Sequence, residues 1–106
     1  MKKIVYEKLV RDKIPQIIAA SGNTCVTEVL PDDAYLRKLD EKLTEELAEY
    51  QQSKSLEELA DLLEVMQTVV LVRGYSWEEL EQVRAEKYSR RGGFADKILL
   101  KEVHEA

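Results

Sequence analysis

The sequence has one cysteine, two prolines and four glycines, and it has no long apolar run. A single cysteine, Cys25, excludes an internal disulfide framework and is typical of a reducing compartment. With 44 % hydrophobic residues, the composition excludes disordered and collagen-like chains. Because no stretch of about 18 apolar residues occurs, and none follows the lysines near the start, we expect neither a membrane-spanning helix nor a secretory leader. We therefore predict a cytoplasmic protein with no membrane partner.

The length of 106 residues accommodates one domain, over residues 1–106, with one modest core. The net charge of −5 argues against nucleic acid as a partner. Charge is unevenly distributed, since residues 40–64 carry nine acidic and two basic side chains, while basic side chains gather in residues 1–13 and 84–91. An acidic block between two basic blocks suits a metal ion held near bound phosphates. The alternative is a set of solvated helix faces.

The spacing of apolar residues predicts a mainly α protein. Four helices are expected, over residues 12–20, 34–51, 56–73 and 77–90. Residues 31–33 offer an N-cap for the second helix, and capping boxes that begin at Ser55 and Ser76 precede the third and fourth. Two apolar segments, 24–30 and 97–103, are predicted to pair as strands. The expected architecture is an antiparallel helical hairpin bundle with a small two-stranded β ribbon.

The third expected helix is apolar over most of its circumference. One apolar face is formed by Leu59, Leu62, Leu63, Met66, Val69 and Val70. Val65 and Val72 form a second stripe, which Glu58 and Asp61 share. A helix that is apolar on two sides is buried on two sides. Because a chain of this length can hardly supply both partners, we predict a homo-oligomer, a dimer or a tetramer, built on this helix.

Two pairs of carboxylates form the strongest chemical signal. Glu46 and Glu49 lie three residues apart on the second expected helix, as Glu58 and Asp61 do on the third, so each pair shares a helix face. The pairs are symmetric about the turn, so an antiparallel hairpin sets Glu46 opposite Asp61, with helix axes about 8–10 Å apart. Such like charges repel unless a cation lies among them. The four hard oxygen ligands favour Mg²⁺ or Mn²⁺, and Mg²⁺ commonly takes substrate phosphates as further ligands.

Each of these acidic residues also has a plainer interpretation. Glu58 is the third residue after Ser55, so a capping box alone explains it. The glutamates of residues 45–49 fit a solvated helix face, and Asp61 fits a surface position. An alternative function is therefore a non-catalytic helical module for oligomerisation or partner binding, which docks a basic partner through its acidic block.

Taken in order along the chain, these motifs resemble the all-α nucleoside triphosphate pyrophosphohydrolases, the MazG-like group that includes the phosphoribosyl-ATP pyrophosphohydrolases. The family pattern, Glu-Glu-x-x-Glu followed by Glu-x-x-Asp, stands here at residues 45–49 and 58–61. Residues 86–94 match a family element that places Lys and Arg against phosphates, and residues 8–15 resemble the opening of a small single-domain branch. The chain departs from the pattern in its short connection between the carboxylate pairs. It also lacks the Asn that many relatives carry between the phosphate-binding Lys and Arg.

The resemblance implies Mg²⁺-dependent hydrolysis of a nucleoside triphosphate, or a related nucleotide, at the α–β phosphate bond, to a monophosphate and pyrophosphate in a house-cleaning role. It implies Glu46, Glu49, Glu58 and Asp61 as metal ligands, and Glu45 or Glu49 as the base that orients the attacking water. Six basic residues are implied as phosphate contacts, namely Lys8, Arg11, Lys13, Lys87, Arg90 and Arg91. A phosphoribosyl-ATP pyrophosphohydrolase of histidine synthesis shares this chemistry, and it stays open as an alternative.

Overall fold

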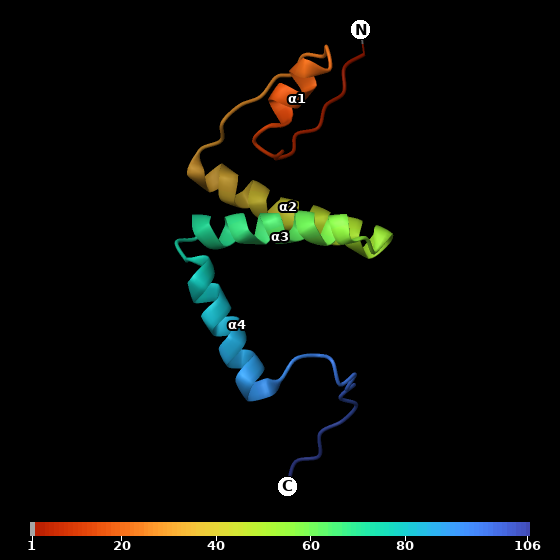
Figure 1. Ribbon diagram of the computed structural model, residues 1–106, viewed down its shortest axis with the longest axis vertical. Helices are drawn as coiled ribbons and strands as arrows, with labels where there is room; N and C mark the ends of the chain where they lie inside the picture. The colour runs from red at the N-terminus through yellow and green to blue at the C-terminus, as the bar shows by residue number, and fades with distance from the viewer. Residues whose placement is uncertain (1) are drawn as a thin grey trace.

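The computed structural model describes residues 2–106 and consists of helices joined by extended segments (Figure 1). The helices are α1 (Ile14–Ala20), α2 (Asp32–Ser53), α3 (Leu56–Val72) and α4 (Trp77–Arg91). The predicted mainly α class is therefore confirmed. No helix within residues 2–106 is both long enough and apolar enough to cross a membrane.

The α2–α3 hairpin is the packed centre of the molecule, and its two helices lie side by side along most of their length (Figure 1). Helix α2 ends at Ser53, and the left-handed backbone of its C-cap, Lys54 (φ 58°), turns the chain sharply back into α3. Among the described residues, Leu39 of α2 is the only apolar side chain that is buried. The predicted antiparallel hairpin thus forms and leaves most apolar side chains partly exposed.

Residues 7–11, ahead of α1, contact this hairpin. Helix α1 begins after Lys13 with Pro15 in its first turn, where the missing N–H of proline is tolerated. It ends before Gly22, whose positive φ of 90° suits glycine. Ahead of α1, Lys38 of α2 donates a hydrogen bond to the carbonyl of Glu7. The segment that precedes α1 therefore lies against α2.

The predicted caps are only partly present. The N-cap of α2 is Pro31, within the expected residues 31–33, but no side chain caps the helix there. Asp32 and Asp33 lie inside the first turn instead, where the helix dipole favours negative charge. Ser76 forms the complete capping box at α4, whereas Ser55 caps α3 from one side only.

The predicted β ribbon is wrong, since no strand forms within residues 2–106. Residues 24–30 connect α1 to α2, whereas residues 97–103 follow α4 at the other end of the molecule (Figure 1). Val26 and Val29 are fully exposed. Helix α4 carries the second segment away from the first, and an isolated two-stranded ribbon is at best marginally stable.

Candidate metal centre

The hairpin brings together the carboxylates that the spacing places opposite each other. Glu46 of α2 and both Glu58 and Asp61 of α3 offer oxygen atoms that all lie within 4.8 Å of one another. A second group, Glu45, Glu46 and Glu49, meets the same limit along α2. Glu46 belongs to both groups, so the two form one continuous acidic cluster across the hairpin.

Two oxygen atoms of this cluster are withdrawn from water and lack a partner. The Glu46 side chain is only 8 % exposed. Its Oε2 atom, and that of Glu58, are buried without a hydrogen-bond partner among residues 2–106. Leaving a buried charged acceptor unpaired costs about 1–3 kcal/mol or more, so native proteins rarely do so without a reason. A cation placed between α2 and α3 would satisfy both atoms.

The capping geometry explains how the Glu58 carboxylate reaches the cluster. Ser55 Oγ accepts the backbone N–H of Glu58 at 3.3 Å, which begins α3. In a complete capping box the Ser55 N–H would also donate to the Glu58 carboxylate. Here the Ser55 N–H donates to Ser53 Oγ at 3.3 Å instead. In the complete box at α4, by contrast, the Ser76 N–H donates to the Glu79 carboxylate. Capping alone therefore does not account for the Glu58 side chain, which turns inward toward α2.

Loss of solvent, followed by the like charge of Glu49, shifts the ionisation of Glu46 and Glu58. Burial raises the pKa of Glu46, and contact with the neighbouring Glu49 carboxyl raises it further. Loss of solvent also raises the pKa of Glu58, again with a contribution from Glu49. Glu49 thus lies between two carboxylates that resist ionisation together, which is the electrostatic setting that a divalent cation relieves.

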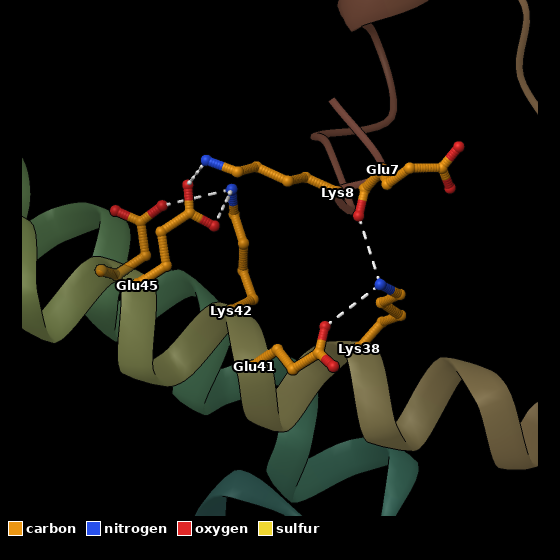
Figure 2. A network of polar contacts seen from close by, with 7 residues as sticks. Glu7, Lys8, Lys38, Glu41, Lys42 and Glu45 are labelled. Atoms are coloured by element: carbon orange, nitrogen blue, oxygen red, sulfur yellow. Dashed lines mark hydrogen bonds and ion pairs between the residues drawn. The ribbon is translucent and has the colours of Figure 1, made fainter. Parts of the chain in front are cut away.

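Two lysines flank the outer edge of the cluster, at Glu45 (Figure 2). Lys8 Nζ lies 3.1 Å from Glu45 Oε1, and Lys42 Nζ lies 3.3 Å from Glu45 Oε2. Lys42 also lies 3.5 Å from Glu46. Burial opposes ionisation of Glu45, but the hydrogen bonds from both lysines outweigh it and lower the pKa of this carboxyl. Glu45 is therefore ionised and engaged at both oxygens.

Arg11 contacts the cluster at Asp61 of α3. Its guanidinium donates to Asp61 Oδ1 at 2.6 Å, and this hydrogen bond raises the pKa of Arg11. Arg11 and Asp61 line a hollow of about 270 Å³. The remaining lining residues are Val10, Ile14, Lys42, Glu46, Glu64 and Val65. The hollow thus places the acidic cluster on one side and the N-terminal segment on the other.

The other predicted phosphate contacts are not brought to this hollow. Lys13 stands exposed at the N-cap of α1. Lys87, Arg90 and Arg91 are exposed on α4, which diverges from the hairpin (Figure 1). Within residues 2–106, no ion pair joins any of these four side chains to the acidic cluster. Of the two basic groups, only the N-terminal one reaches the site within a single chain.

Lys42 is a candidate site residue that the sequence motifs do not identify. It lies three and four residues before Glu45 and Glu46, a spacing that places a cation beside both carboxylates on one helix face. That spacing could have identified it. Glu64, which lines the hollow one turn after Asp61, carried no comparable signal.

The comparisons with known proteins add little to this geometry. No model of a known protein family matches the chain. A protein of Mycolicibacterium smegmatis, described as an uncharacterized protein, is 57 % identical over 42 residues. That match covers 40 % of this chain and 43 % of the relative, so it spans less than half of either protein. No solved structure matches. Function is therefore inferred from the geometry of the acidic cluster and the hollow beside it.

Proposed function

We propose that this chain is a Mg²⁺-dependent nucleotide pyrophosphohydrolase of house-cleaning type, acting at the α–β phosphate bond. The observation that carries the proposal is the pair of buried, unpartnered carboxylate oxygens on Glu46 and Glu58, two side chains that come together across the hairpin. A docking surface for a basic partner would keep its carboxylates in solvent, where a partner can reach them. The inward position of these two argues for an ion rather than a docked protein.

The residues present fit a hard divalent cation. Glu46, Glu58 and Asp61 would supply oxygen ligands from two helices, and Glu49, which is grouped with Glu45 and Glu46, would supply a fourth at the more exposed edge. The carboxylate oxygens favour Mg²⁺, with Mn²⁺ as a substitute. When bound, such an ion offsets the negative charge of the phosphate oxygens during hydrolysis.

The two candidate bases have different surroundings. Both oxygens of Glu45 accept from lysines, which lowers its affinity for a further proton. Glu49 contacts Glu46 and Glu58 at the exposed edge of the cluster, where water has access. In the proposed reaction Glu49 orients the water that attacks the α-phosphorus, and it accepts the proton of that water. Glu45 then anchors the lysines that meet the departing pyrophosphate.

The substrate phosphates would enter the hollow beside the N-terminal segment. Arg11 offers a planar guanidinium suited to bidentate phosphate contact, and Lys8 offers a point charge nearby. The apolar part of the lining, Val10, Ile14 and Val65, offers no group that distinguishes one base from another. Phosphoribosyl-ATP therefore stays an alternative substrate. The free, exposed thiol of Cys25 suits the cytoplasmic location that belongs to this proposal.

The experiment that tests the proposal is pyrophosphate release with and without Mg²⁺. Purified protein would be incubated with the common ribo- and deoxynucleoside triphosphates and with phosphoribosyl-ATP. We expect release from at least one substrate with Mg²⁺ and its loss on chelation, because the clustered carboxylates need the ion to accept a polyphosphate. Release that persists in excess chelator would contradict the metal-dependent mechanism. No release from any substrate would favour the non-catalytic module.

The same proposal includes a homo-oligomer, and the exposed surface supports it. The chain exposes 9955 Å², whereas a compact protein of this mass exposes about 6,000 Å². The radius of gyration is 19.0 Å, against about 13 Å for a compact domain of this length. An obligate dimer buries about 1,000–2,500 Å² on each partner. The exposed surface beyond that of a compact protein is therefore larger than the area that one subunit buries in an obligate dimer.

The surface most suited to a second copy lies on the hairpin. An apolar hollow of about 380 Å³ is lined by Leu43, Thr44, Leu47, Leu62 and Met66. We expect the wild type to show at least twice the monomer mass in sedimentation or light scattering. Leu47→Glu should reduce that mass, because it buries an unpaired charge in the contact. Val26→Glu adds the same charge to a fully exposed connecting segment and should leave the mass unchanged. A folded, monomeric wild type would contradict the prediction.

A further inference from the structure

The N-terminal segment reaches the acidic cluster through a strained bend at Glu7. This residue has a positive φ of 50°, in the left-handed region that glutamate rarely adopts. The following residue is Lys8, whose Nζ lies 3.1 Å from Glu45. The bend therefore sits immediately before the side chain that the segment delivers to the site. Such a conformation persists only where the surroundings hold it.

Lys38 of α2 is the side chain that holds this bend. Its Nζ donates to the carbonyl oxygen of Glu7 at 3.2 Å, while the Glu7 carboxylate points away from the helix (Figure 2). The contact thus acts on the backbone of the bend and does not depend on the Glu7 side chain. Lys38 also pairs with Glu41 at 3.2 Å, one helical turn further along α2. It makes no ion pair with Glu45, Glu46 or any other member of the acidic cluster in the described part of the chain.

By holding the Glu7 carbonyl, Lys38 restricts the backbone at the neighbouring Lys8 without contacting the Lys8 side chain. The Lys8 side chain is 53 % exposed, so its ion pair with Glu45 competes with the freedom of a long chain in water. An anchored backbone reduces that competition. The anchors lie on both sides of Lys8, with Glu7 held by Lys38 on one side and Arg11 held by Asp61 on the other.

We propose that Lys38 is a positioning residue for the proposed reaction, because its grip on the Glu7 carbonyl fixes the backbone from which Lys8 reaches Glu45 and the incoming phosphates. The inference rests on the proposed function for the role of Lys8, but its structural part stands on the contacts alone. Among the described residues, Lys38 itself forms no ion pair with the acidic cluster and does not line the hollow beside it.

Limited trypsin digestion of the full chain tests the structural part, with cleavage after Lys8 followed by mass spectrometry. Trypsin must bind the lysine side chain in its specificity pocket before it cleaves the bond that follows. While Lys8 is paired with Glu45, its side chain is not available to that pocket. We expect Lys38→Met to speed cleavage after Lys8 by about fivefold, because the loss of one charge-assisted hydrogen bond raises the open population by about that factor. Lys38→Arg should restore the wild-type rate. Glu41→Gln removes the other partner of Lys38 and should leave the rate unchanged.

Steady-state kinetics tests the functional part. Lys38→Met is expected to raise KM for the nucleotide about as much as Lys8→Met does, with a smaller effect on kcat. The double variant should be no worse than Lys8→Met alone, since both changes act through one side chain. Additive losses, or equal losses in Glu41→Gln and Lys38→Met, would overturn the proposal. If the wild type shows no turnover, the proposed function fails, and the cleavage rates still decide whether Lys38 positions Lys8.

Discussion

Glu58→Gln is expected to reduce pyrophosphate release by about a hundredfold or more, while leaving the helix content unchanged. Glutamine keeps the size of the side chain but removes the charge whose buried oxygen faces Glu46. Removing one group that stabilises the charge developing in the transition state, as an ion held by Glu58 would, costs about 10²–10³ in rate in other enzymes. The fold is expected to survive, because the Ser55 hydroxyl accepts from the backbone N–H at position 58, which glutamine retains.

The chain supplies a matched control for this variant in its own second cap. Glu79 occupies the same position after Ser76 that Glu58 occupies after Ser55, but its carboxylate accepts from the Ser76 N–H. Glu79→Gln should therefore change stability by less than about 1 kcal/mol and leave turnover intact. Turnover and divalent-ion dependence are measured for both proteins side by side. Equal losses in the two variants would show that Glu58 matters only as a cap, and would contradict the metal site.

The same pair of caps shows where reading a sequence reaches its limit. Ser55 and Ser76 begin the same motif, and local reasoning assigns both glutamates at its end to capping. Only Glu79 caps in the reciprocal sense. Glu58 differs because α2 lies opposite it, and that neighbour comes from the packing of two helices. The symmetric spacing of the carboxylates about the turn did predict that Glu58 lies opposite α2, because that spacing relates positions on both helices.

Features set by contacts between residues close in sequence are predicted correctly, whereas features that need contacts between distant segments are not. The positions of the helices follow from apolar spacing, serine caps and the glycine after α1, all of which act within a few residues. The pairing of residues 24–30 with 97–103 needed contact between segments about 70 positions apart, which no local signal specifies. Lys8 and Arg11 reach partners 37 and 50 positions away. A resemblance in motif order indicated those two residues, although spacing alone could not have placed them.

Mg²⁺ or Mn²⁺ is expected to raise the melting temperature by about 10 °C or more at a hundredfold excess over Kd. An ion that binds only the folded state at that concentration adds about 2.7 kcal/mol to the free energy of unfolding. For a domain near 100 residues, each kcal/mol raises the melting temperature by about 4–8 °C. Ca²⁺, with its larger coordination sphere, tests the fit, and an equal ionic strength of NaCl separates binding from screening.

The pH dependence of this stabilisation has a definite sign. The folded-state pKa values of Glu46 and Glu58 are raised, so the folded state holds more protons than the unfolded state does. Without the ion, their contribution to stability is present below about pH 4, the ordinary range for glutamate, and is lost as pH rises through the raised values. The ion replaces those protons, so its effect on melting should grow as the pH rises above the ordinary range for glutamate. The hydrogen bond from Arg84 lowers the pKa of Glu81, so the contribution of Glu81 to stability is instead lost as the pH falls.

Two variants connect the melting shift to the cluster. Glu46→Gln should abolish most of the shift and its growth with pH, because it removes the ligand shared by both acidic groups. Glu81→Gln removes a carboxylate of α4 that pairs with Arg84, and the shift should persist in full. The apo form of Glu46→Gln is expected to melt above the apo wild type near neutral pH, since a neutral amide does not repel Glu49. A shift that survives Glu46→Gln unchanged would place the ion elsewhere and would contradict a metal centre within the hairpin.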